Sequence, residues 1–345
     1  MDHNLALDFV RVTEAAAYAS AHWVGRGDNE SADQAAVTAM RDAFSALDID
    51  GEIVIGEGER DEAPMLFIGE HVGCCKGGTM VSTKKIDIAV DPLEGTNICA
   101  KGGINAISVL AAGPKGTLLK APDTYMDKIA VGPQARGAID IDASVKDNIY
   151  AVADKLGKPP DELTVIILER DRHKDLISQV RHAGARIRLI GDGDVSAAIS
   201  TVFDYSGIDM LLGIGGAPEG VLAAAALKTL GGDMQGRLKY RNEKEKERAQ
   251  AMGIGDLDRV FGLDDMVRGD HSMFVATGVT DGPLLKGVRF TSWGAVTNSV
   301  AMRSYSGTVR FLDTQHHFRD TPEDWWNKIK EDNKHNKTPK VKQSH

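Results

Sequence analysis

The sequence predicts an α/β fold, in which strands and helices alternate along the chain. After Lys158, three short apolar runs are each followed by a polar loop and then by residues with helical spacing. These runs are Leu163 to Leu168, Arg186 to Ile190 and Met210 to Ile214. Ligands in open α/β sheets bind at the carboxyl ends of the strands, so the loops after these runs are candidates for a binding site.

The length of the chain and a proline pair predict two subdomains. A chain of 345 residues is long for one hydrophobic core. Lys158-Pro159-Pro160 is interpreted as the hinge, because beyond it the pattern changes to repeated strand and helix. We expect an N-terminal α+β subdomain over residues 1-157, a C-terminal α/β subdomain over 158-330, and a basic, flexible tail over 331-345.

The composition is that of a globular protein and narrows the possible partners. Hydrophobic residues make up 42% of the chain and charged residues 26%, and the formal net charge is -9. This negative charge argues against nucleic acid or an anionic membrane as a partner. The chain has no apolar run long enough for a membrane span, and Met1 to Val10 does not resemble a signal peptide, so we expect a cytoplasmic protein.

Two helices are predicted at the N-terminus. The first runs from Leu5 to Val24, and the second begins at Ser31, which forms a capping box with Gln34. Asp33 then falls in the first helical turn. The helix dipole alone explains most carboxylates at such a position, so only its neighbours in space can give Asp33 a function.

Asp50-Gly51 is predicted to form a turn, and Glu52 to Ile55 a strand that leads into Gly56-Glu57-Gly58. Two interpretations of this glycine-flanked glutamate stay open. The glycines can bend the backbone so that it aims the Glu57 carboxylate, or the segment can be an ordinary solvated turn.

The stretch from Lys85 to Thr96 is the strongest chemical signal in the sequence. Apolar residues alternate with others up to Asp91, which is the pattern of a strand, and Glu94 follows after Pro92. Carboxylate oxygens beside the Thr96 hydroxyl suit magnesium or manganese. Taken alone, the stretch is also compatible with a calcium loop or an acidic surface turn.

The remaining elements follow the same reading. Ala106 to Ala112 is predicted as a strand before a turn at Gly113, Ala121 to Met126 as irregular, and Arg237 to Met252 as a solvated helix. Tyr125 can be a core ring or a substrate contact. Further strands are expected at His271 to Val279, Gly287 to Trp293 and Ser306 to Leu312, and a helix at Val221 to Leu230.

Five acids from separate elements end strands or begin helices. Gathered in one site they would repel one another unless cations neutralised them, and two divalent ions are the usual solution in phosphoryl chemistry. The five are Asp33, Glu57, Asp91, Glu94 and Glu219.

With these motifs, the chain resembles the class II fructose-1,6-bisphosphatases along nearly its whole length, most of all the cyanobacterial branch that also takes sedoheptulose-1,7-bisphosphate. This family belongs to the inositol-monophosphatase superfamily. The matching residues are Gly25-Arg26-Gly27-Asp28, Ala32-Asp33, Ile53 to Glu59, Asp61 to Met65, Asp91 to Thr96, Ala121-Pro122-Asp123 with Tyr125-Met126, Asp192-Gly193-Asp194, and Gly213 to Gly220.

The resemblance implies a layered α/β/α/β/α sandwich with a mainly antiparallel N-terminal sheet, and a homotetramer. It implies a phosphoric monoester hydrolase that removes the C1 phosphate of fructose-1,6-bisphosphate, and that of sedoheptulose-1,7-bisphosphate, in the Calvin cycle and gluconeogenesis. Mg²⁺ or Mn²⁺ would be the cofactor, and AMP is a candidate inhibitor. The superfamily commonly has Asp where this chain has Glu94, which leaves the metal geometry open.

The resemblance also implies roles for single residues. The five acids would hold the metals, with Leu93 lending a carbonyl, and Thr96 with Glu57 or Asp33 would orient the attacking water. Gly95 and Thr96 amides would bind the scissile phosphate. The sugar and its distal phosphate would be held by Tyr125, Arg170, Arg172, Asp192 and Asp194.

Cys75 lies in a segment that better-known members of the family shorten or lack, and Cys99 follows the metal motif by three residues. Two interpretations stay open. The cysteines can be buried or idle thiols, or Cys75 and Cys99 can form a disulfide that disturbs the loop carrying Asp91 and Glu94, and in the cytosol such a bond would act as a switch.

Three alternatives remain at this point. A phosphatase of inositol phosphates or nucleotide 3'-phosphates would share the metal core. A metal-stabilised scaffold would bind the ion without releasing phosphate. An NAD-type oxidoreductase would need a Gly-x-Gly-x-x-Gly turn that opens a βαβ unit, and the sequence has none.

Overall fold

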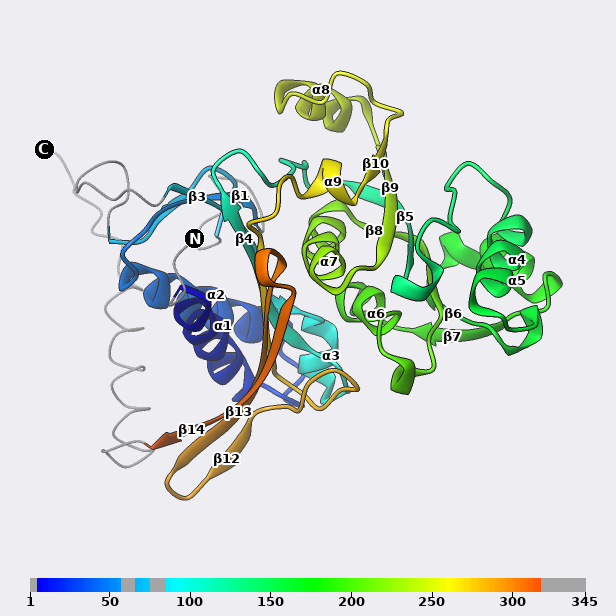
Figure 1. The fold of residues 1–345 in the computed structure, drawn as a ribbon. Coiled ribbons are helices and arrows are strands. Elements are labelled where there is room, and N and C mark those ends of the chain that lie inside the picture. The colour runs from blue at the N-terminus through cyan, green and yellow to red at the C-terminus, as the bar shows by residue number, and fades with distance from the viewer. Residues whose placement is uncertain (1–4, 57–65, 75–84, 318–345) are drawn as a thin grey trace, which may run out of the picture.

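The fold is a stack of five layers (Figure 1). The computed structural model describes residues 5–56, 66–74 and 85–317. Helices α1 (Leu5–Ala21) and α2 (Asn29–Ser45) cover the outer face of the first sheet. Helices α6 (Asp194–Ser200) and α7 (Ala217–Leu230) lie between the two sheets, and α4 (Val145–Leu156) with α5 (Lys174–His182) covers the second sheet from outside. This order confirms the α/β fold and the layered α/β/α/β/α arrangement that the sequence led us to expect.

The first sheet has the strand order β12-β13-β11-β4-β3-β1-β2, and β14 also pairs with β13. Every pair of neighbours is antiparallel except β1 and β3, so the expectation of a mainly antiparallel sheet is confirmed. Its strands are β1 (Asp50–Ile55), β2 (His71–Val72), β3 (Lys85–Glu94), β4 (Ile107–Pro114), β11 (Met273–Gly278), β12 (Arg289–Thr291), β13 (Gly294–Arg303) and β14 (Thr308–His317).

The second sheet has the order β10-β9-β5-β8-β6-β7, and its β8, β6 and β7 run parallel. Strands β6 and β8 therefore end at the same edge, next to the loops that were predicted to bind ligand. The strands are β5 (Tyr125–Val131), β6 (Thr164–Leu168), β7 (Arg186–Ile190), β8 (Met210–Gly216), β9 (Asp233–Lys239) and β10 (Val260–Gly262). The smaller helices are α3 (Thr96–Lys101), α8 (Glu243–Ala251) and α9 (Leu263–Met266).

Helix α7 joins the two halves of the core. Its residues from Gly220 to Leu227 are all buried, because strands of both sheets pack against it. A helix that is apolar on every side is stable only in such a position. Strand β3 is buried along nearly its whole length for the same reason, since α1 and α7 pack on its opposite faces.

Several predicted elements need correction. Asp50 and Gly51 lie in strand β1 and do not form a turn, and Gly113 lies inside β4. The N-cap of α2 is Asp28, whose side chain accepts a hydrogen bond from Ser31 N, so Ser31 is inside the helix. Residues 237–239 belong to β9, and only the part from Glu243 is helical.

The sheets also divide the chain differently from the predicted hinge at Lys158. Strand β5 and helix α4 precede Lys158 but belong to the second sheet and its outer layer, and β11 to β14 follow it but belong to the first sheet. The subdomain ranges 1-157 and 158-330 stay a prediction, because sheet membership alone does not define independent domains. Among the helices of the described residues, none is long and apolar enough to cross a lipid bilayer.

Candidate metal centre

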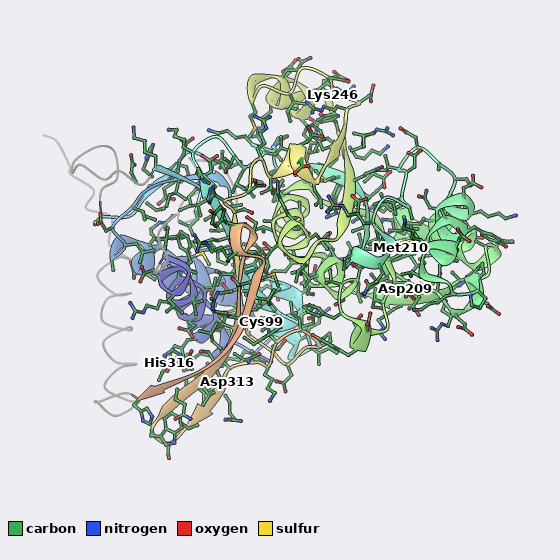
Figure 2. All side chains as sticks on the ribbon, in the orientation of Figure 1. Cys99, Asp209, Met210, Lys246, Asp313 and His316 are labelled. Carbon is green, nitrogen blue, oxygen red and sulfur yellow. The ribbon has the colours of Figure 1, made fainter. Side chains whose placement is uncertain are left out.

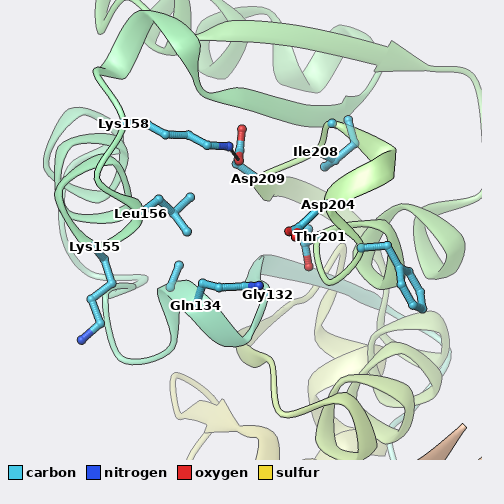
Figure 3. Close-up of a pocket in the computed structure, with 12 residues that line it drawn as sticks. Gly132, Gln134, Lys155, Leu156, Lys158, Thr201, Asp204, Ile208 and Asp209 are labelled. Atoms are coloured by element: carbon cyan, nitrogen blue, oxygen red, sulfur yellow. Dashed lines mark hydrogen bonds and ion pairs between the residues drawn. The ribbon is translucent and has the colours of Figure 1, made fainter.

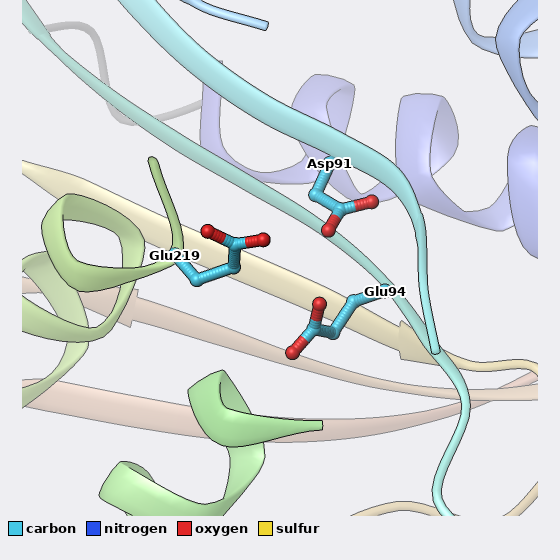
Figure 4. A group of neighbouring side chains, drawn as sticks. All are labelled: Asp91, Glu94 and Glu219. Carbon is cyan, nitrogen blue, oxygen red and sulfur yellow. The ribbon is translucent and has the colours of Figure 1, made fainter. Parts of the chain in front are cut away.

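Three of the five predicted acids come together between the two sheets. Asp91 and Glu94 lie at the end of β3, and Glu219 lies in the first turn of α7. One carboxylate oxygen from each side chain lies within 4.8 Å of the others (Figure 4). Glu219 therefore faces the β3 acids across the interface between the two halves of the core.

A register irregularity in β3 allows Asp91 and Glu94 to point to the same place. Residues three apart in a regular strand face opposite sides of the sheet. The pairing of β3 with β4 shifts between Asp91 and Glu94, and Pro92 lies in that interval. Such a bulge turns the backbone and re-aims the side chains beyond it. The Asp91 carboxylate also accepts a hydrogen bond from Leu93 N at 3.1 Å, which fixes the turned segment.

Glu219 is brought to the centre by the start of α7. Gly216 is the N-cap of this helix, and Pro218 occupies its first turn. A side chain at Gly216 would collide with Glu219, since a Cβ there would lie 1.8 Å from its Oε2. That Oε2 is buried and has no hydrogen-bond partner in the described structure. The site thus contains a buried carboxylate oxygen that can serve as a metal ligand.

The pKa values indicate the same need for positive charge. Burial, with the nearby charge of Asp91, raises the pKa of Glu94 well above its usual value. Burial and the charge of Asp194 raise the pKa of Glu219 to about 7, although Lys128 opposes the shift. Hard oxygen ligands, crowded together and costly to ionise, are the donor set that a divalent cation stabilises. These residues can hold a metal ion.

Thr96 and Gly95 lie directly beyond these acids. Gly95 has φ +88°, a conformation that favours glycine, and precedes α3. The Thr96 hydroxyl donates to the carbonyl oxygen of Leu93 at 3.0 Å. Its hydrogen is therefore committed to the backbone, and the oxygen remains available as an acceptor.

The predicted sugar and phosphate residues lie at the carboxyl edge of the second sheet. The Arg172 guanidinium lies over the Tyr125 ring, 4.7 Å from its centroid, and donates from Nε and Nη2 to the Ile214 carbonyl. His173 holds the preceding peptide group of the same residue, because its Nε2 accepts a hydrogen bond from Ile214 N at 2.8 Å. The loop after β6 is thus attached to β8, two residues before Gly216.

Arg170 and Asp192 lie near each other in the same region. Arg170 donates to the Glu169 carbonyl at 3.0 Å, and its charge opposes the effect of burial, which raises the pKa of Asp192. Asp194 is buried at the first position of α6 and forms an ion pair with Lys128. Asp194, which was predicted to contact the sugar, therefore already has a charged partner inside the protein.

Other predicted residues lie apart from this group or outside the described chain. Asp33 is in α2 and is not one of the three clustered acids, although its helix contacts α3 through a hydrogen bond from Asn29 to Asn97. Glu57 and Cys75 lie outside the described residues.

The predicted disulfide therefore stays a prediction. Cys99 lies in α3 (Figure 2) and is buried, and burial raises the pKa of its thiol to about 11. Disulfide exchange requires a thiolate, so α3 would have to open before Cys99 could react.

Sequence reasoning missed two cations at the site. Lys128 is inside β5, a strand that the sequence analysis did not predict, and Arg241 lies in the segment assigned to a solvated helix. The Arg241 guanidinium lies 5.2 Å from the Tyr125 ring centroid and pairs with Glu245. Lys128 directly precedes the apolar run Ile129-Ala130-Val131, which was the available signal for a buried charge, although Asp127 on its other side obscured it.

A cavity of about 580 Å³ lies at the opposite end of the second sheet (Figure 3). It is lined by Lys155, Lys158, Asp204 and Asp209 among others, and Lys158 forms an ion pair with Asp209 at 2.6 Å. It contains none of the predicted site residues, so it is separate from the metal centre.

The chain is similar to known proteins over most of its length. The family model of bacterial fructose-1,6-bisphosphatase, glpX-encoded, matches residues 3–316. A D-fructose 1,6-bisphosphatase class 2/sedoheptulose 1,7-bisphosphatase of Synechococcus sp. is 47% identical over 334 residues, which cover 92% of this chain and 96% of that protein. The protein of the same name from Microcystis aeruginosa is 47% identical over 339 residues, covering 92% and 97%.

Among solved structures, an extragenic suppressor from Pyrococcus furiosus is similar over 57% of this chain and 69% of its own. Its sequence identity is 12% and the TM-score is 0.29, so this likeness supports no conclusion.

Proposed function

We propose that this chain, which belongs to the family of glpX-encoded bacterial fructose-1,6-bisphosphatases, hydrolyses the C1 phosphate of fructose-1,6-bisphosphate and of sedoheptulose-1,7-bisphosphate. The reaction is that of a phosphoric monoester hydrolase. The observation that carries the proposal is the group of Asp91, Glu94 and Glu219, with ligand oxygens within 4.8 Å, beside a threonine hydroxyl and an arginine-bearing loop.

The cofactor in this proposal is Mg²⁺ or Mn²⁺. Asp91, Glu94 and Glu219 would hold it, with Asp33 and Glu57 as the further acids of the predicted set. The ion supplies a Lewis acid that polarises a phosphate oxygen and lowers the pKa of bound water. The chain's part is to keep three carboxylates converged, which the β3 bulge and the start of α7 do.

The two phosphates of the substrate are bound at opposite ends of the site. Backbone amides of Gly95 and Thr96 bind the scissile phosphate, and the guanidinium of Arg172 binds the distal one together with Arg170 and Tyr125. Arg172 uses Nε and Nη2 for the Ile214 carbonyl, so its Nη1 hydrogens remain for the phosphate. Asp192 and Asp194 act on the sugar hydroxyls, and the existing ion pair of Asp194 limits its freedom to do so.

Thr96 orients the water that attacks phosphorus. Its hydroxyl hydrogen is donated to Leu93, so the oxygen accepts a hydrogen from the water. The water oxygen bonds to phosphorus while Glu57 or Asp33 takes the water's proton, and the bond from phosphorus to the sugar oxygen breaks. The same acid then returns the proton to the sugar oxygen, which leaves as a hydroxyl. The products are the sugar monophosphate and inorganic phosphate.

Phosphate release with Mg²⁺ or Mn²⁺ tests the proposal, with both bisphosphates, an inositol monophosphate and a nucleotide 3'-phosphate as substrates. We expect turnover of the two bisphosphates above that of the other esters. Asp91→Ala should abolish turnover and weaken Mn²⁺ binding. The matched control is Asp313→Asn on the edge strand β14, where Asp313 accepts a hydrogen bond from Asn298 at 2.9 Å (Figure 2). Normal release by Asp91→Ala would contradict the proposal.

The cellular setting is part of the same proposal. We propose that the chain acts in the Calvin cycle and gluconeogenesis, in the cytoplasm. We also propose that it forms a homotetramer, with AMP as a candidate inhibitor. These proposals are supported by membership of the family, and the net charge of -9 agrees with a cytoplasmic protein that binds neither nucleic acid nor an anionic membrane.

A further inference from the structure

Lys128 is an unusual residue for its position. It lies in β5, an inner strand of the second sheet, and its side chain is 3% exposed. Among the lysines and arginines of the described residues it is the only buried one. A buried ammonium is costly unless it is paired, so its retention inside the protein needs a specific set of partners.

Those partners are the starts of the two central helices. Lys128 Nζ pairs with the carboxylate of Asp194, the first residue of α6, and donates to the carbonyl oxygen of Gly216, the N-cap of α7, at 2.9 Å. Helix α6 in turn reaches the metal centre, because Val195 N donates to Glu94 Oε1 at 3.3 Å. Lys128 is therefore linked to both Glu94 and Glu219 through one helix start each.

The backbone around Lys128 is shaped to admit this ion pair. A Cβ at Gly215 would lie 2.0 Å from Asp194 Oδ2 and 2.8 Å from Lys128 Nζ. A Cβ at Gly220 in α7 would lie 3.4 Å from Lys128 Cδ, close to the stem of the same side chain. The space for the ammonium thus depends on the absence of a side chain at Gly215.

The charges that face Lys128 are mostly negative. Asp194 is its direct partner, and the presence of Lys128 lowers the pKa of Glu219 against the effect of burial. Asp194 raises the pKa of both Glu94 and Glu219, so the acid centre and the ion pair belong to one electrostatic group.

We propose that Lys128 is a positioning residue that acts as a permanent cation of the acid centre, holding α6 and α7 together and setting the affinity of the centre for a divalent ion. This inference rests on the proposed metal site. A fixed positive charge close to the acids repels an incoming dication, so it lowers affinity for the metal while it keeps the empty centre folded. The direction of the change in metal affinity distinguishes this role from a purely structural one. Loss of a lysine that only supports packing would weaken metal binding or leave it unchanged, whereas loss of a repelling charge would strengthen it.

The test is Mn²⁺ binding without substrate, measured by calorimetry or electron paramagnetic resonance on the full chain. Lys128→Met should bind Mn²⁺ on the order of tenfold more tightly than the wild type, and Asp194→Asn on the order of tenfold more weakly. The double variant Lys128→Met/Asp194→Asn removes one charge of each sign and should lie within about threefold of the wild type.

A second readout is thermal stability. Without metal, Lys128→Met should melt at a lower temperature than the wild type, because Asp194 is left buried without its partner. Added Mn²⁺ should raise its melting temperature by more than it raises that of the wild type. Lys158→Met is the matched control, since Lys158 pairs with Asp209 at the far end of the same sheet and its loss changes the net charge equally. Its Mn²⁺ affinity should stay within about threefold of the wild type.

The outcomes separate the two hypotheses. A wild type that binds no Mn²⁺ would contradict the metal site itself. A wild type that binds Mn²⁺, with a folded Lys128→Met that binds equally or more weakly, would contradict the role of Lys128. If Lys128→Met does not fold, the comparison of Asp194→Asn with the double variant decides, because the double variant should bind Mn²⁺ about tenfold more tightly. Equal binding by those two would overturn the proposal.

Discussion

Arg172→Ala should weaken the binding of a bisphosphate far more than it slows the chemistry. The Arg172 guanidinium is held over Tyr125 and against the Ile214 carbonyl, so it is fixed before the substrate arrives. Hydrogen bonds to a charged group contribute about 1.5–3 kcal/mol each. Loss of about 2 kcal/mol corresponds to a roughly thirtyfold rise in KM.

The assay compares two substrates. With fructose-1,6-bisphosphate, Arg172→Ala should raise KM roughly thirtyfold and change kcat by less than about threefold, because binding at a remote phosphate is mostly uniform between substrate and transition state. With fructose 1-phosphate, which has no distal phosphate, the variant should equal the wild type. Arg186→Ala is the control, since Arg186 is an exposed arginine at the start of β7 that donates to the Glu162 carbonyl at 2.6 Å.

Equal losses with both substrates would refute this reasoning. Such a result would mean that Arg172 acts by holding Ile214, and through it the start of α7, and that it does not contact the distal phosphate. Arg172→Lys is a further check. A lysine keeps the charge but cannot hold the carbonyl through two nitrogens and bind phosphate at the same time, so most of the loss should remain.

Two further predictions concern the attacking water and the stability of the fold at low pH. Thr96→Ala should lower kcat about a hundredfold with little change in KM, because the hydroxyl acts in the transition state. Thr96→Ser keeps the hydroxyl and should keep most of the activity. A rise in KM without a fall in kcat would contradict this role. Stability should fall below pH 6.5, since burial lowers the pKa of His22 to about 4 and also lowers the pKa of His173. A histidine whose folded pKa lies below the unfolded value stabilises the fold fully above the unfolded pKa, and this stabilisation is lost as the pH falls towards the folded pKa. For the partly exposed His22 we expect about 1 kcal/mol between pH 7 and pH 4 in urea unfolding, after a discount for solvent screening. His22→Phe, beside Tyr18 and Phe290, should reduce this slope, and an unchanged slope would exclude His22 as its source.

The parts of the fold that the sequence predicted have strong local patterns. The spacing of apolar residues before Asp91, and in the strands and helices after Leu163, shows which side chains are buried. Strands β3, β6, β7 and β8 all lie where this spacing predicted them. Strand β5 was missed because Asp127 and Lys128 interrupt its apolar pattern. The space for its lysine depends on Gly215 of β8, where a Cβ would lie 2.8 Å from Lys128 Nζ, and such a contact is not visible in a local sequence pattern.

The same limit applies to β9, where the charges of Arg237 and Lys239 indicated a solvated helix. In the structure Arg237 reaches Asp142 and the Asp258 carbonyl, so its charge is satisfied by residues distant in sequence. Charge density predicts exposure only where the partners are local. Of the five predicted acids, Asp91, Glu94 and Glu219 lie together in the structure, and the cations beside them were harder to predict.

Glu94 shows why the geometry of the centre needed the structure. The sequence raised two difficulties for Glu94 as a metal ligand. Its side chain is one methylene longer than the aspartate that is common at this position in the superfamily. In addition, Asp91 and Glu94 are three residues apart and should face opposite sides of a regular strand. The bulge between Asp91 and Glu94 removes the second difficulty, and the longer arm has a specific anchor, because its Oε1 accepts from Val195 N at the start of α6. A shorter aspartate at this position would have to give up either that anchor or its place beside Asp91 and Glu219. The extra methylene therefore couples the metal-binding strand to α6, the helix whose first residue pairs with Lys128.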